Sequence, residues 1–106
     1  MDIPIELHNA VSSRDDHDRD LYILAEERIN RLAKGHTDIT RAEITLTEPT
    51  KNNHTTYIVE ATVVLFIRPS NISATETAGE PKIALKGALD AVERQVYQKR
   101  EKLRNY

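Results

Sequence analysis

The stretch TYIVEATVVLFI, residues 56–67, decides the fold that the sequence predicts. Every second side chain from Tyr57 to Ile67 is apolar, whereas the side chains between them are mixed in character. Successive side chains of a strand point to opposite faces of a sheet, so this pattern predicts a strand with one wholly apolar face. Such a face requires a second layer of structure to cover it.

Three further segments alternate in the same way and predict three more strands. In the first of them, Pro4 restricts the strand to a sheet edge or places the proline at its start. The last one is the weakest, because only Ile72 and Ala74 give it an apolar side. The three segments are IPIELH (3–8), ITRAEITLTE (39–48) and NISATETA (71–78).

Two segments have the period of an amphipathic helix instead. The first spans about residues 18–34 and is followed by Gly35, a residue that often ends helices. The second spans about residues 81–103, with Pro81 suited to the first helical position. Lys99 falls within the apolar sector of this helix, which indicates that its last turns extend beyond the sheet.

The element order is therefore β-α-β-β-β-α. Two amphipathic helices and four strands with one apolar face predict an α+β fold, a four-stranded sheet with both helices packed on one face. At 106 residues, we expect a single domain over residues 1–106.

Composition and spacing argue against several functional classes. The chain has no Cys, and its four His residues lie in four separate segments, so we expect no metal site and no cofactor. His17 lies among aspartates, a pattern that favours a solvated loop before the first helix over a weak divalent-ion site. Glu43 and Glu60 are either a carboxylate pair or solvated sheet residues, and we favour the second interpretation. We expect a protein that is not an enzyme.

The sequence also lacks the signals of membrane insertion and secretion. The apolar run 58–67 is interrupted by Glu60 and Thr62, and the N-terminus has neither a basic start nor an apolar core. We therefore expect a cytoplasmic protein with no membrane partner.

Charge is distributed unevenly along the chain. From Lys82 onward there are seven basic and three acidic residues, a net charge of +4, whereas the rest of the chain carries −6. Four of the bases form a strip beside the apolar side of the second helix, and Glu93 interrupts it; they are Lys82, Lys86, Arg100 and Arg104. Basic side chains on a rigid helix suit contacts with phosphates, and the alternative is a merely solvated helix.

The second face of the sheet carries three large apolar side chains, Ile58, Val64 and Phe66. These residues either mark a partner surface, including one for weak self-association, or pack under a loop.

The element order and the second helix together resemble the ribosome hibernation factor family, whose members are also called sigma-54 modulation or S30EA-like proteins. The similarity is strongest in Ala84–Leu85, in the run DAVERQV (90–96) and in the basic stretch from Lys99 to Leu103. His8–Asn9 and Arg31–Leu32 resemble the end of the family's first strand and of its first helix. The similarity covers essentially the whole chain.

This resemblance implies a fold like that of double-stranded-RNA-binding domains and a role as a translation inhibitor. Such proteins bind the small ribosomal subunit, contact its 16S rRNA and occupy the mRNA–tRNA channel. The rRNA contacts that it implies here are Lys82, Lys86, Arg94, Lys99, Arg100 and Lys102 on the second helix, and Arg28, Arg31 and Lys34 on the first. The alternative is a protein-interaction module of the same fold that does not bind RNA.

The sequence also departs from the family pattern. The family opens its last helix with Asp-Leu-Tyr-Ala-Ala-Ile-Asp, whereas residues 80–86 read EPKIALK, so Lys82 and Lys86 replace a Tyr and an Asp. Because the chain stops at Tyr106, we expect no C-terminal dimerisation domain of the kind found in the long-form relatives.

Overall fold

The computed structural model describes residues 3–11, 18–48, 58–68 and 70–104. Their elements follow the predicted β-α-β-β-β-α order and form one four-stranded sheet and two helices, so the predicted α+β fold is confirmed. The strand predicted at 56–67 begins at Val59, and Tyr57 lies outside the described residues. The elements are β1 (Ile5–Asn9), α1 (Asp18–Gly35), β2 (Ile39–Thr47), β3 (Val59–Ile67), β4 (Ile72–Ala78) and α2 (Pro81–Arg104).

The strands lie in the sheet in the order in which they occur in the chain. β1 pairs with β2 in parallel, and the pairs β2–β3 and β3–β4 are antiparallel. Pro4 lies just before β1, as its missing N–H requires. Its carbonyl still accepts a hydrogen bond from the N–H of Ala42 at 3.1 Å, which extends the ladder by one residue.

An irregularity interrupts the alternation of β2 between Ile39 and Arg41. Ile39 and Ala42 are both buried although they lie three residues apart, because Thr40 is an additional residue in this strand. The hydroxyl of Thr40 donates a hydrogen bond to the carbonyl of Phe66 at 3.0 Å. A β-bulge of this kind redirects the neighbouring side chain, here Arg41, onto the outer face of the sheet.

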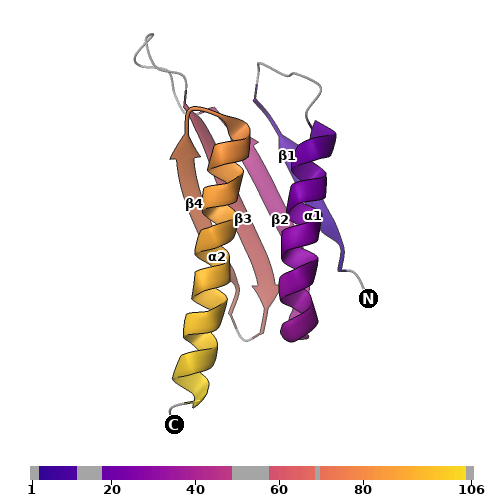
Figure 1. Cartoon of the computed structure of the whole chain (residues 1–106), viewed down its shortest axis with the longest axis vertical. Coiled ribbons are helices and arrows are strands. Elements are labelled where there is room, and N and C mark those ends of the chain that lie inside the picture. The colour runs from indigo at the N-terminus through magenta and orange to yellow at the C-terminus, as the bar shows by residue number, and fades with distance from the viewer. Residues whose placement is uncertain (1–2, 12–17, 49–57, 69, 105–106) are drawn as a thin grey trace.

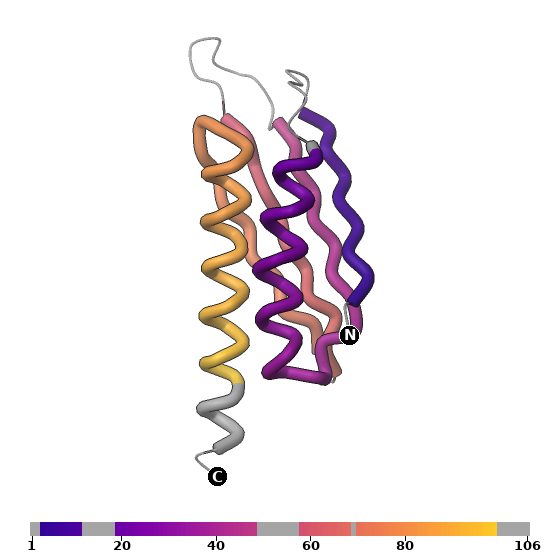
Figure 2. Tube along the Cα trace, turned by 45° about the vertical axis from the view of Figure 1, so that its right-hand side comes forward, coloured from indigo at the N-terminus to yellow at the C-terminus, as the bar shows by residue number. Residues whose placement is uncertain are grey.

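Both helices cover the same face of the sheet, with α1 over the β1 side and α2 over β3 and β4 (Figure 1). They lie side by side and run in the same direction, as Figure 2 also shows. Gln95 fastens α2 to the edge strand through a hydrogen bond from Nε2 to the carbonyl of Ser73 at 2.9 Å.

The core lies between the helices and the inner face of the sheet. The apolar side of β3 is buried from Val59 to Ile67, as the alternation predicts, and it packs with five side chains of α2. These are Leu85, Ala88, Leu89, Val92 and Val96. α2 continues beyond the end of the sheet, which confirms the overhang inferred from the position of Lys99 (Figure 1).

Truncation of Ile44 should destabilise the protein strongly. Ile44 lies in a central strand with none of its surface exposed, so Ile44→Ala removes packing and leaves a cavity that costs about 2–5 kcal/mol. Urea denaturation of wild type and variant measures this loss. Ile23→Ala is the matched control, because Ile23 is 42% exposed on α1 and its truncation should change stability by less than about 0.5 kcal/mol. Equal losses in the two variants would contradict this account of the core.

Candidate nucleic-acid interface

Six basic side chains of the described helices are exposed. Five of them are predicted contacts, and we call the surface that these five form the helix-pair surface; the sixth, Arg19, lies in the first turn of α1. Within the described part of the chain, none of these five side chains takes part in an ion pair or a hydrogen bond. A cation without an internal partner is available to an external anion. The five residues are Arg31 and Lys34 of α1 and Lys82, Lys86 and Arg94 of α2.

On α2, two of these cations lie on the flank that faces α1. At about 100° per residue, Lys82 and Lys86 fall within about 40° of Glu93 around the helix axis, and Glu93 contacts Arg28 of α1. Arg94 lies about 100° from Glu93 in the same projection and points to solvent. The three side chains therefore share the exposed side of α2 without pointing in one direction.

The two exposed cations of α1 also differ in direction. Arg31 lies about 60° around the axis from Arg28, so it borders the contact between the helices. Lys34 lies about 120° from Arg28 and points away from α2. Lys34 is in the last turn of α1, where a positive charge interacts favourably with the helix dipole.

Among the predicted contacts whose side chains are described, Arg28 is the one paired with acidic residues. Its Nη2 donates hydrogen bonds to Oδ1 of Asp90 at 2.6 Å and to Oε1 of Glu93 at 3.4 Å, and so joins α1 to α2. The Arg28 side chain is 22% exposed, whereas the Asp90 side chain is 58% exposed. The hydrogen bond to Asp90 raises the pKa of Arg28 above its usual value, against the opposing effect of burial. The pairing therefore contributes stability below that usual pKa and is lost only at more alkaline pH.

Lys99 is half-buried, and its position differs from that of the exposed cations. Its Nζ is enclosed, with no hydrogen-bond partner in the described part of the chain. Two residues earlier, Tyr97 packs edge-to-face against His36, the residue that follows α1, with ring centroids 5.4 Å apart. The side chains of Arg100 and Lys102 lie outside the described part of the chain, and their predicted role stays a prediction.

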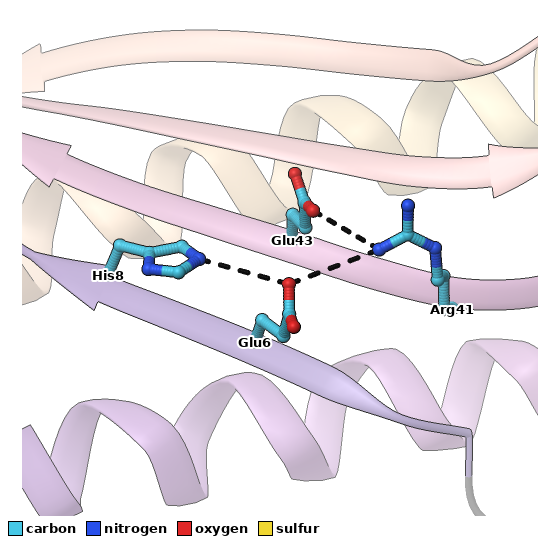
Figure 3. Close-up of polar contacts among 4 residues, drawn as sticks. All are labelled: Glu6, His8, Arg41 and Glu43. Carbon is cyan, nitrogen blue, oxygen red and sulfur yellow. Dashed lines mark hydrogen bonds and ion pairs between the residues drawn. The ribbon is translucent and has the colours of Figure 1, made fainter.

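The outer face of the sheet carries a polar cluster, shown in Figure 3 with the helices behind the strands. Arg41 lies 3.1 Å from Oε2 of Glu43 and 4.0 Å from Oε1 of Glu6, and His8 lies 3.8 Å from the same Glu6 oxygen. We call Glu6, His8, Arg41 and Glu43 the sheet-face cluster. Two carboxylates surround this one guanidinium, so Arg41 is less available to an external phosphate than the unpaired cations of the helices.

The apolar side chains of the outer sheet face are partly covered. The guanidinium of Arg41 lies 3.8 Å from the centre of the Phe66 ring, a cation–π contact. Val64 is half-buried between Glu43 and Ser73, its partners on the neighbouring strands, while Ile58 remains 42% exposed. The sequence left two interpretations of these residues, a partner surface or packing under a loop. Phe66 is covered by Arg41, a residue of the sheet itself.

Two other groups of residues were candidates for chemistry, a carboxylate pair on the sheet and an ion site before α1. Glu43 lies opposite Val64 and Glu60 opposite Thr47, so the register separates these two carboxylates. No group of three or more His, Cys, Asp or Glu residues that could hold a metal ion occurs among the described residues. The segment around His17, for which the sequence favours a solvated loop over a weak ion site, lies outside the described residues. None of the helices described here is long and apolar enough to cross a membrane.

The partners of Arg28 were not identified from the sequence. The available signal was the pair of acids, Asp90 and Glu93, that interrupts or borders an otherwise basic strip on α2. Charges that break a strip in this way indicate a partner on another element, but the spacing alone does not say which one.

Comparison with known proteins identifies a family and solved structures of similar fold, two of which are described here. A family model described as sigma 54 modulation protein / S30EA ribosomal protein matches residues 10–104. The Thermus thermophilus Protein Y N-terminal domain has a TM-score of 0.64 and 19% identity, over 92% of this chain and 98% of that one. A ribosomal subunit interface protein from Coxiella burnetii has a TM-score of 0.65 and 18% identity, over 93% and 99%. At these identities the likeness establishes a common fold. No curated protein sequence matches significantly.

Removal of the Arg28 side chain charge should weaken the contact between the helices. Arg28→Gln deletes a charge-assisted hydrogen bond of 2.6 Å, but Asp90 is largely solvated, so we expect a loss of about 0.5–1.5 kcal/mol in unfolding free energy. Urea denaturation at low and high salt measures it. Arg31→Gln removes an exposed, unpaired cation from the same helix and should change stability by less than about 0.5 kcal/mol.

Replacement of Lys99 should stabilise the protein. The enclosed ammonium has no partner in the described part of the chain, and a methionine fills similar space without the unpaired donor, a gain of about 1–2 kcal/mol. Thermal unfolding of Lys99→Met tests this, with the exposed Lys34→Met as the control. A lower melting temperature for Lys99→Met than for the control would show that the ammonium is satisfied in solution.

Proposed function

The chain belongs to the sigma 54 modulation protein / S30EA ribosomal protein family, and from that premise we propose that it is a hibernation factor that inhibits translation. The proposed partner is the small ribosomal subunit, bound through its 16S rRNA. The protein acts by steric occlusion, because it occupies the mRNA–tRNA channel and excludes both RNAs. This role is non-catalytic and cytoplasmic, needs no cofactor, and is carried by residues 1–106 as one ribosome-binding domain.

The exposed, unpaired cations of the helix-pair surface are the observation that carries this proposal. Each phosphate that such a side chain neutralises releases condensed counterions from the RNA, and this release drives binding at low salt. The helices hold the backbone of these residues rigidly over the core, so binding has to order only the side chains.

The proposed contact residues fall into two groups. Lys82, Lys86, Arg94, Arg31 and Lys34 are exposed and unpaired in the described part of the chain, which suits direct contacts with phosphates. Arg28, Lys99, Arg100 and Lys102 remain in the proposal on the strength of the family resemblance. Within this second group, Arg28 is engaged by Asp90 and Glu93.

The structural neighbours support the same class of partner. The Coxiella burnetii protein is described as a ribosomal subunit interface protein and has the same fold over 93% of this chain. The choice of the small subunit, and of its channel, rests on the family resemblance and on the cationic helices.

A second candidate function uses the opposite side of the molecule. Ile58 is 42% exposed on the outer sheet face, and together with Val64 and Phe66 it offers apolar area to a protein partner or to a second copy of the chain. This reading predicts no RNA binding. It also predicts no effect of charge removal on the helices.

Removal of two charges from α2 should weaken binding to small ribosomal subunits. Lys82→Gln with Lys86→Gln deletes two proposed phosphate contacts, so the slope of log affinity against log salt should fall by about 1.4–1.8. Co-sedimentation of purified protein with bacterial small subunits, from low to high salt, measures affinity and slope together.

The matched control removes two charges elsewhere, with Arg41→Gln on the sheet face and Arg68→Gln in the turn after β3. Its salt slope should equal that of the wild type. Equal effects of the two double variants would mean that net charge alone matters, and no binding by the wild type at low salt would favour the protein-interaction function.

A further inference from the structure

Asp90 occupies a position on α2 from which it can pair with either of two cations of the helix-pair surface. Lys86 precedes it by four residues and Arg94 follows it by four residues. Oppositely charged side chains at this spacing are neighbours on a helix and commonly form ion pairs. The sequence of α2 taken alone therefore predicts that Asp90 pairs with one of these two bases.

In the structure Asp90 pairs with Arg28 of the other helix. The Nη2 of Arg28 lies 2.6 Å from Oδ1 of Asp90, and in the described part of the chain neither Lys86 nor Arg94 has an ion pair. The interhelical contact has replaced both intrahelical alternatives. Two exposed cations are left without an internal partner as a result.

We propose that Arg28 is a positioning residue that sequesters Asp90 and so keeps Lys86 and Arg94 available to the phosphates of a bound RNA. This inference rests on the proposed function, since it concerns the availability of the same cations. For Arg28, this positioning role replaces the direct phosphate contact that the family resemblance implies.

The geometry favours Arg28 over the two competing bases. Its side chain is 22% exposed, so its charge is screened less by water and salt than those of Lys86 and Arg94, which are exposed. Its Nη2 also donates to Glu93 at 3.4 Å, so the two acids of this region are held by a single guanidinium. Neither Lys86 nor Arg94 has such a second contact with Glu93 in the described part of the chain.

A charge-neutral pair of substitutions separates this role from a direct one. Arg28→Gln releases Asp90 to pair with Lys86 or Arg94, so affinity for small ribosomal subunits should fall about fivefold at low salt, with a shallower salt slope. Arg28→Gln with Asp90→Asn has the net charge of the wild type and no carboxylate to capture the two bases. Its affinity should return to within about twofold of wild type.

Comparison of stability with affinity separates the positioning role from a merely structural one, in which both quantities would change together. Asp90→Asn does not restore the bridge between the helices, so the melting temperature should stay lowered in the double variant while its affinity recovers. Recovery of both quantities, or of neither, would overturn the proposal. In particular, a double variant that binds as weakly as Arg28→Gln would show that Arg28 contacts phosphate itself.

The sheet-face cluster supplies matched controls with the same changes of charge. Arg41→Gln, and Arg41→Gln with Glu43→Gln, alter an arginine–carboxylate pair of 3.1 Å on the opposite face, and both should bind like the wild type. If Arg28→Gln binds no worse than Arg41→Gln, sequestration of Asp90 has no effect and the proposal fails. If the wild type itself does not bind small subunits, the proposed function fails, and this inference fails with it.

Discussion

The apolar inner face of the sheet is the constraint on which the rest of this structure depends. β3 is buried on that face along its whole length, and a single layer of strands cannot exclude water from it. Two amphipathic helices cover this face. Because both lie on the same side of the sheet, their exposed sides together form one surface of the molecule. The surface that carries the cations therefore results from the way in which the core is closed.

The two sides of the molecule differ electrostatically for the same reason. The helix-pair surface carries five exposed cations without internal partners among the described residues. On the outer sheet face, by contrast, Arg41 is surrounded by Glu6 and Glu43 and lies over Phe66. An arginine held in this way contributes to the sheet, whereas the exposed Lys82 and Lys86 of α2 contribute little to the fold.

Periodicity in the sequence was sufficient to predict the element order and the buried side of each element. Alternation in 56–67 and the helical spacing from Leu85 to Val96 are local signals, and burial enforces them. The bulge at Thr40 could not be predicted, because it depends on the partner strand. The Arg28–Asp90 pair could not be predicted either, since helix spacing favoured Lys86 or Arg94 as the partner of Asp90, and only the packing of α1 against α2 brings Arg28 closer. The enclosed position of the Lys99 Nζ could not be predicted in full either. The helical pattern placed Lys99 on the buried side of α2, but no partner for its ammonium could be identified from the sequence.

The parallel pairing of β1 with β2 has a consequence for the order of folding. β2, β3 and β4 are joined in sequence as antiparallel neighbours, so these pairings close short loops. β1 can reach β2 only after the chain has passed through the whole of α1, because parallel neighbours require a crossover. Contacts between distant parts of a chain form slowly, and β1 has the shortest ladder of the sheet. The topology therefore favours a nucleus made of the three-stranded meander and α2, with the N-terminal strand docking last.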